Sequence, residues 1–202
     1  MKGVIKKDLY MIKNYCKSYL LFLLVFLVFP MFSKESSFLS AYLFLLPSMA
    51  VITVISYDEK NNWESYFQQL PVKVEETVLA KYVIGATISI AVLLLYSVCA
   101  YFRYGVSIIY AFSTMSIVAF VSFAITMPFY FRFGSHMGRI AYYVSLGVIV
   151  FIAMQAQFNI TEASPVIPNG VDGIFALIGL ALFIGSYFLS VVLYKTRLKK
   201  LR

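Results

Sequence analysis

Charged residues are scarce in this sequence of 202 residues: they make up 13% of it, whereas a soluble domain carries about a quarter. Histidine occurs once and cysteine twice, which is too few for the clustered ligands and paired nucleophiles of metal and catalytic centres. No polar stretch is long enough for a soluble catalytic domain of roughly 100 residues. These absences exclude a water-soluble enzyme and indicate an integral membrane protein.

Two further absences limit how such a protein could obtain energy. The apolar runs contain no ionisable group of the kind that proton- or sodium-driven transporters place at membrane depth. The phosphate-binding pattern G-x-x-x-x-G-K-[ST] is also missing, so the chain cannot bind ATP by that route. We therefore expect no cofactor, no metal and no catalysis in this chain, and energy supplied by another subunit.

Long apolar runs are what the sequence has instead, since 61% of its residues are hydrophobic. A helix that crosses a bilayer needs about 20 apolar residues. Six runs approach this length, at residues 19–32, 38–56, 82–102, 108–131, 140–156 and 174–194. The first run is short and crosses only if Lys17 and Lys34 extend their side chains to the two interfaces. The predicted fold is an all-α polytopic membrane protein with six transmembrane helices.

The basic residues lie at the ends of these runs. Fifteen of them fall on the side of the two termini, and only Lys34 and Arg103 fall on the other side. Because the side with the excess of Lys and Arg stays in the cytoplasm, both termini are predicted to be cytoplasmic. The net charge of +8 thus reflects membrane orientation, and we expect no nucleic-acid partner.

The first 18 residues have the pattern of an amphipathic helix with a basic edge. Its apolar positions follow helical spacing, and its lysines share this spacing one residue later. The apolar positions are Ile5, Leu9, Ile12 and Cys16, and the basic ones are Lys6, Lys13 and Lys17. Such a helix would lie in the plane of the membrane interface. The alternative is a simple charged flank to the first span.

The only sizeable loop on the predicted cytoplasmic side covers residues 57–81. Its aromatic and apolar residues Trp63, Tyr66, Phe67 and Leu70 share one face of a short helix, which Pro71 ends. This loop holds five acids against three lysines, so anionic headgroups would not favour it. The helix could pack on its own bundle, or it could dock a protein partner through its aromatic side chains.

The loop and the start of the third span contain a pattern of an acid, a tryptophan, an aromatic residue, Leu-Pro-Val with a basic residue, and Lys-Tyr. The residues of this pattern are Asp58, Trp63, Tyr66, Leu70, Pro71, Val72, Lys73, Lys81 and Tyr82. In this pattern the loop resembles that of small bacterial ABC-2 type permeases.

The resemblance implies a single permease domain over residues 1–202 in the bacterial cytoplasmic membrane. In that family a second permease chain, identical or a sister, completes the export path, and the cargo is often a peptide or a hydrophobic toxic compound. A separate cytoplasmic ABC ATPase docks on a coupling helix in this loop, which implies docking through Trp63, Tyr66, Phe67, Leu70 and Pro71. The competing hypothesis is a non-transporting immunity or assembly factor that binds a partner in the bilayer.

Overall fold

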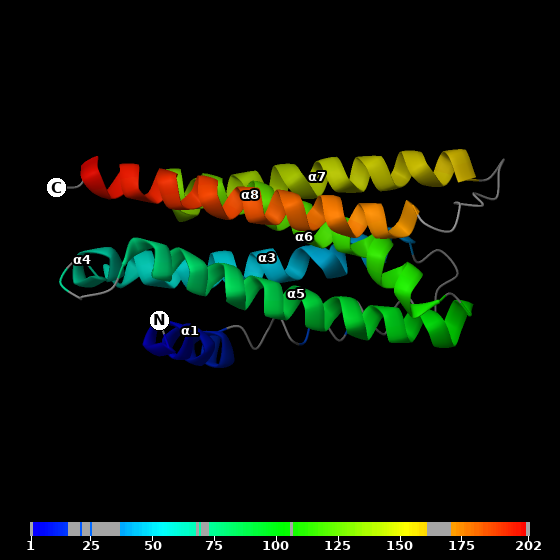
Figure 1. Ribbon diagram of the computed structural model, residues 1–202, viewed down its shortest axis with the longest axis horizontal. Helices are drawn as coiled ribbons and strands as arrows, with labels where there is room; N and C mark the ends of the chain where they lie inside the picture. Colours follow the sequence, from blue (N-terminus) through cyan, green and yellow to red (C-terminus); the bar gives the residue numbers. More distant parts are fainter. Residues whose placement is uncertain are drawn as a thin grey trace.

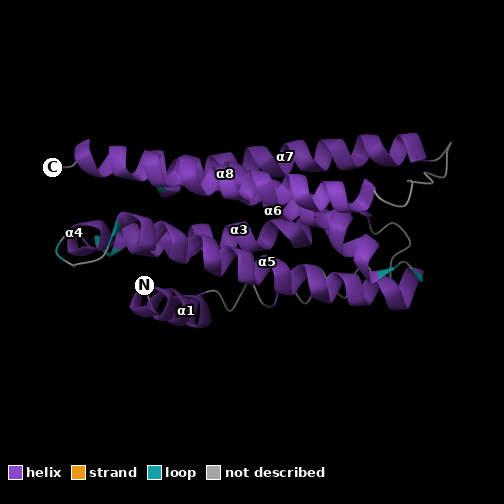
Figure 2. Cartoon of the chain, viewed as in Figure 1, coloured by secondary structure: helices purple, strands orange, loops and turns teal. Residues whose placement is uncertain are grey.

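The computed structural model describes residues 2–15, 21, 25, 37–67, 69, 73–105, 107–160 and 171–200. Every regular element in these ranges is a helix, which confirms the all-α prediction (Figure 2). The helices are α1 (Lys2–Tyr15), α3 (Ser37–Lys60), α4 (Trp63–Phe67), α5 (Val74–Tyr104), α6 (Ile108–Phe133), α7 (Ser135–Ile160) and α8 (Val171–Lys200).

Five long helices coincide with five of the six predicted spans: α3, α5, α6, α7 and α8. Within the described residues, three stretches are long and apolar enough to cross a membrane, at Val74–Phe102, Ala111–Phe133 and Ala176–Lys199. The first predicted span, residues 19–32, lies outside the described residues apart from Leu21 and Val25. The structure therefore supports a multi-pass membrane protein, while the count of six spans stays a prediction.

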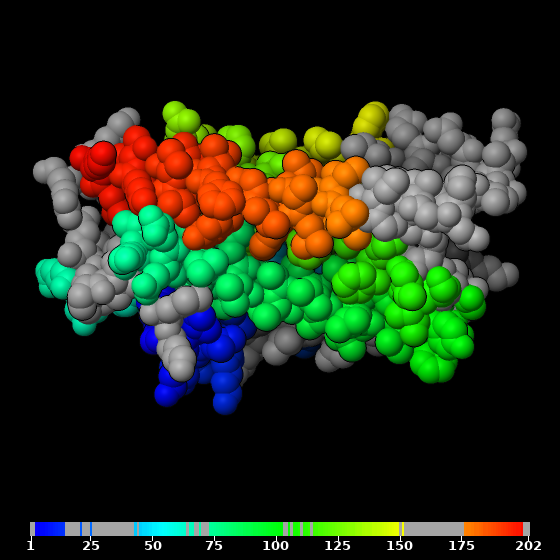
Figure 3. Space-filling model, in the orientation of Figure 1, coloured from blue at the N-terminus to red at the C-terminus, as the bar shows by residue number. Residues whose placement is uncertain are grey.

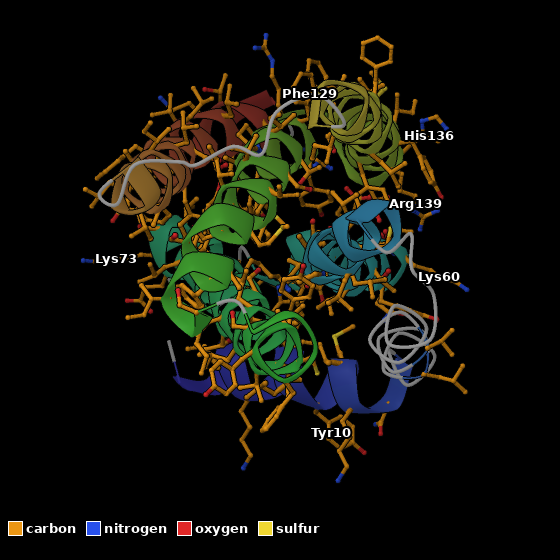
Figure 4. The ribbon with its side chains drawn as sticks, turned by 90° about the vertical axis from the view of Figure 1, so that its right-hand side faces the viewer. Tyr10, Lys60, Lys73, Phe129, His136 and Arg139 are labelled. Carbon is orange, nitrogen blue, oxygen red and sulfur yellow. The ribbon has the colours of Figure 1, made fainter. Side chains whose placement is uncertain are left out.

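The long helices lie side by side, and α1 lies across them (Figure 1). The view along the long axis shows α1 lengthwise, whereas the other helices are seen nearly end-on (Figure 4). Helix α6 contacts each of the other long helices, α3, α5, α7 and α8. Its side chains Phe123 and Met127 are fully buried, so α6 forms the centre of the bundle.

Helices α5 and α8 lie side by side on one face of the molecule (Figure 3). Both helices expose large aliphatic and aromatic side chains, among them Leu94, Leu95 and Val98 on α5 and Leu182, Ile184 and Phe188 on α8. A helix that is apolar on its exposed side as well as its buried side is typical of a membrane span.

Hydroxyl groups join the helices inside this apolar bundle. The hydroxyl of Tyr82 on α5 lies 2.7 Å from Ser186 Oγ and 2.8 Å from Ser190 Oγ, both on α8. Ser48 on α3 and Ser122 on α6 form a similar pair at 3.1 Å. Such contacts suit membrane helices, which associate through close packing and interhelical hydrogen bonds because lipid offers no hydrophobic driving force.

One of these hydroxyls compensates for a proline in α6. Pro128 has no N–H, so it cannot bond to the carbonyl four residues earlier, at Ala124. Ser186 donates its hydroxyl to this carbonyl oxygen at 2.8 Å, and α6 is helical on both sides of Pro128. The proline thus gives α8 a hydrogen-bonded contact with α6, as neighbouring helices do for prolines in other membrane spans.

Helices α5 and α6 approach each other closely at Gly85. A Cβ atom placed there would lie 2.2 Å from the ring of Phe123, which is itself fully buried. Gly85→Ala should therefore lower stability by about 1–3 kcal/mol through overpacking, measured by thermal unfolding of the purified protein. Gly147→Ala is the matched control, because a Cβ at that exposed position of α7 meets nothing within 4 Å. Equal stability of the two variants would contradict this packing.

Candidate functional site

Helix α4 lies at the end of the bundle where the last turns of α8 also lie (Figure 1). A tight turn after α3 places it there: the N–H of Asn61 donates to the carbonyl of Tyr57, and that of Asn62 to the carbonyl of Glu59. Asn62 has a positive φ of 52°, a conformation that asparagine adopts more readily than most residues. The chain can thus reverse within two residues and begin α4 at Trp63.

The predicted docking residues that the structure describes differ in how far their side chains are exposed. The side chain of Trp63 is partly buried, whereas that of Tyr66 is 56% exposed, and their ring centroids are 5.5 Å apart. The backbone of Phe67 ends α4, but its side chain, Leu70 and Pro71 lie outside what the structure describes. The two placed side chains therefore share one helix, with Trp63 turned inward and Tyr66 outward.

Four charged side chains gather beside α4, and we call them the ion cluster: Lys7 and Asp8 from α1, Asp58 from α3 and Lys81 from α5. The ammonium of Lys81 donates to Asp8 Oδ1 at 2.8 Å and to Asp58 Oδ2 at 2.6 Å. Lys7 donates to Asp58 Oδ1 at 2.6 Å and lies 3.2 Å from Asp8 Oδ1. The cluster therefore has two positive and two negative charges, and its four side chains come from three helices.

The ion cluster is buried, except at Lys7. Asp8 has no exposed surface, and Asp58 and Lys81 are buried. Charges removed from water in this way require opposite charges and hydrogen bonds close by, and removing one partner costs about 3–5 kcal/mol. The cluster therefore holds α1, α3 and α5 together.

Trp63 connects α4 to the ion cluster. The ammonium of Lys7 lies 3.9 Å from the centroid of the Trp63 ring, within the range of a cation–π interaction. The same ammonium contacts Asp58, which lies five residues before Trp63 in the chain. Lys7 thus joins α4 to the end of α3.

Glu59, the residue after Asp58 in α3, makes a second set of contacts with other helices. Its Oε2 accepts the backbone N–H of Ser135 at 2.9 Å, at the start of α7, and its Oε1 accepts from Arg197 of α8 at 3.1 Å. Gly134 permits this approach, because it has a φ of +92° and a Cβ there would lie 2.9 Å from Glu59 Oε1. The negative charge at the first turn of α7 also suits the helix dipole.

These contacts link helices α1, α3, α5, α7 and α8 to one another at one end of the bundle. In the described part of the chain, no group of three His, Cys, Asp or Glu side chains is arranged to hold a metal ion. The one histidine, His136, is exposed on α7 (Figure 4).

A family model described as ABC-2 family transporter protein matches residues 3–195, which is nearly the whole chain. The chain belongs to the ABC-2 transporter family. This confirms the resemblance seen in the loop sequence and makes the protein a membrane transporter component. No curated protein and no solved structure matches the permease.

Lys7, Asp8 and Glu59 were not among the site residues predicted from the sequence of the permease. Ile5 and Ile12 of the predicted apolar face of α1 pack against the core. Leu9 of that face is 53% exposed, and the buried side of α1 carries Val4 and Asp8. The available signal was the spacing of Val4, Asp8 and Met11, which places the only acid of α1 on a face with two apolar residues. Lys81 and Asp58 were both part of the family pattern, but their contact with each other and with Lys7 and Asp8 of α1 was not predicted.

Because the ion cluster is buried, we predict that a lysine substitution in α5 lowers the free energy of unfolding much more than one in α8. Lys81→Met leaves Asp8 and Asp58 with Lys7 alone and should destabilise the permease by about 3–5 kcal/mol. Lys195→Met is the control: Lys195 pairs with Glu75 at the same 2.6 Å, but both side chains are about half exposed. Its loss should cost about 0–1 kcal/mol.

Denaturant unfolding of the purified permease, together with the amount of folded protein in the membrane, measures this difference. Similar losses for the two variants would contradict the structural role of the cluster.

Proposed function

We propose that this permease is the membrane-spanning subunit of an ATP-driven exporter. In this proposal six spans cross the bacterial cytoplasmic membrane and both termini lie in the cytoplasm, on the side with fifteen of the seventeen Lys and Arg residues. A separate ABC ATPase supplies the energy. The observation that carries the proposal is the position of α4, which lies at the end of the bundle and contacts the ion cluster through Trp63.

In this mechanism α4 is the coupling helix on which the ATPase docks. Tyr66 supports this role because its ring is exposed at the end of the bundle, and exposed aromatic side chains are frequent anchors of protein interfaces. Trp63 acts differently, because its ring faces the chain's own Lys7. We therefore assign Tyr66 to the contact with the ATPase and Trp63 to the attachment of α4 to the bundle.

Movement of α4 then reaches the spans through two adjacent carboxylates. When ATP closes the partner ATPases, α4 shifts and carries the end of α3 with it. Asp58 transmits the shift to α1 and α5 through Lys7 and Lys81, and Glu59 transmits it to α7 and α8 through Ser135 and Arg197. One small displacement is thus passed to four other helices.

The export path itself requires a second permease chain, identical or a sister. Peptides or hydrophobic toxic compounds are the proposed cargo, on the basis of the family resemblance. An external energy source agrees with the scarcity of ionisable residues in the apolar runs, because coupling to a proton gradient needs a titratable group at membrane depth.

Two α4 variants separate docking from attachment. Tyr66→Ala should leave the amount of folded permease unchanged and weaken ATPase recovery by about 30-fold, as expected for an interface anchor worth about 2 kcal/mol. Trp63→Ala should lower both quantities, since it also removes the contact with Lys7. Ser65→Ala, which changes an exposed polar residue of the same helix, should alter neither.

The measurement is co-purification of the ATPase with tagged permease, normalised to folded permease in the membrane. Full ATPase recovery with Tyr66→Ala would reject α4 as the docking site. Failure of the wild-type permease to retain any ATPase would favour the non-transporting hypothesis.

A further inference from the structure

We propose that the outer face of α1 binds the headgroups of anionic lipids. This face, called here the outer face, consists of Lys6, Leu9, Tyr10 and Lys13, all of which are exposed. Their spacing along α1 places them on one side of the helix, opposite the side that contacts α3 and α5.

The position of α1 directs this face toward the membrane. Helix α1 lies on the flank of the bundle, set back from the end occupied by α4, and crosses the long axis of the bundle (Figure 1). Tyr10 points away from the bundle (Figure 4). In a membrane whose normal follows the long axis, a side chain on the flank near the charged end meets lipid headgroups. A partner that docks on α4 approaches along the axis.

The charge of the outer face is exclusively positive. Asp8 is the only acid in α1, and it is fully buried and held by Lys81 at 2.8 Å. Lys7 also turns inward, toward Asp58. The ion cluster therefore removes the negative charge from the surface of α1, and Lys6 and Lys13 remain to attract anions.

The remaining two side chains of the outer face suit the boundary between headgroups and acyl chains. Leu9 is 53% and Tyr10 67% exposed, and they lie between the two lysines along the helix. Tyrosine is enriched at this boundary because its ring is apolar and its hydroxyl is polar. The ammonium groups of Lys6 and Lys13 would contact the lipid phosphates, and the side chains of Leu9 and Tyr10 would contact the start of the acyl chains.

A photo-crosslinking amino acid in place of Tyr10 tests the proposal on the full-length permease without its ATPase. The permease is reconstituted in vesicles of equal parts phosphatidylglycerol and phosphatidylcholine, and the lipids bound to position 10 are identified by mass spectrometry. We expect phosphatidylglycerol to predominate. Lys6→Gln and Lys13→Gln should each lower its excess by up to about fivefold, and high salt should act in the same direction.

Lys60→Gln with Lys199→Gln is the matched control, because it removes two exposed lysines elsewhere on the chain. This control should leave the lipid ratio unchanged. A wild-type ratio equal to the vesicle composition, crosslinks to protein in place of lipid, or an equal effect of the control would each overturn the proposal. Loss of ATPase recovery plays no part in the readout, so failure here is distinguishable from failure of the proposed docking site.

Discussion

The ion pairs of the buried Lys81 with Asp8 and Asp58 are the interactions on which the arrangement of α1, α3, α4 and α5 depends. A lysine taken out of water is tolerated only beside opposite charges, and Lys81 finds them in Asp8 and Asp58, on two other helices. Neither carboxylate could be buried without it, so the three side chains impose their positions on one another. The cluster therefore fixes where α1, α3 and α5 meet.

Other features of the structure follow from this constraint. Because Asp58 is fixed, the turn that follows it places α4 at the end of the bundle, and Lys7 attaches α4 through Trp63. Because Asp8 is turned inward, the surface of α1 is left positive. If the outer face of α1 binds anionic lipid as proposed, charge holds α1 on both sides. The ion cluster holds it within the protein, and lipid headgroups hold it outside.

The sequence predicted the helices well because long apolar runs and alternating basic ends are local signals. It also identified the loop with Trp63 and Lys81, on which the family resemblance rests, and the family match confirms that resemblance. It did not predict the ion cluster, whose pairs between different helices are 73, 51 and 23 residues apart in the chain. Hydrophobic periodicity records which side of a helix is apolar, but it does not identify the distant charge that permits an acid such as Asp8 to be buried. The hydrogen bond from Ser186 to the carbonyl of Ala124, which compensates for Pro128, could not be predicted either, because it also joins residues far apart in the chain.

The most direct test uses Trp63, the only tryptophan of the chain, as a reporter of the position of α4. Asp8→Asn changes a residue of the ion cluster that lies 3.2 Å from Lys7, the residue whose ammonium contacts the Trp63 ring. If the cluster holds α4 through Lys7, this variant should make Trp63 fluorescence more accessible to the aqueous quencher acrylamide, while Glu75→Gln, in an exposed ion pair, should not. Unchanged quenching in a folded Asp8→Asn permease would contradict the account, because α4 would then keep its place without the cluster.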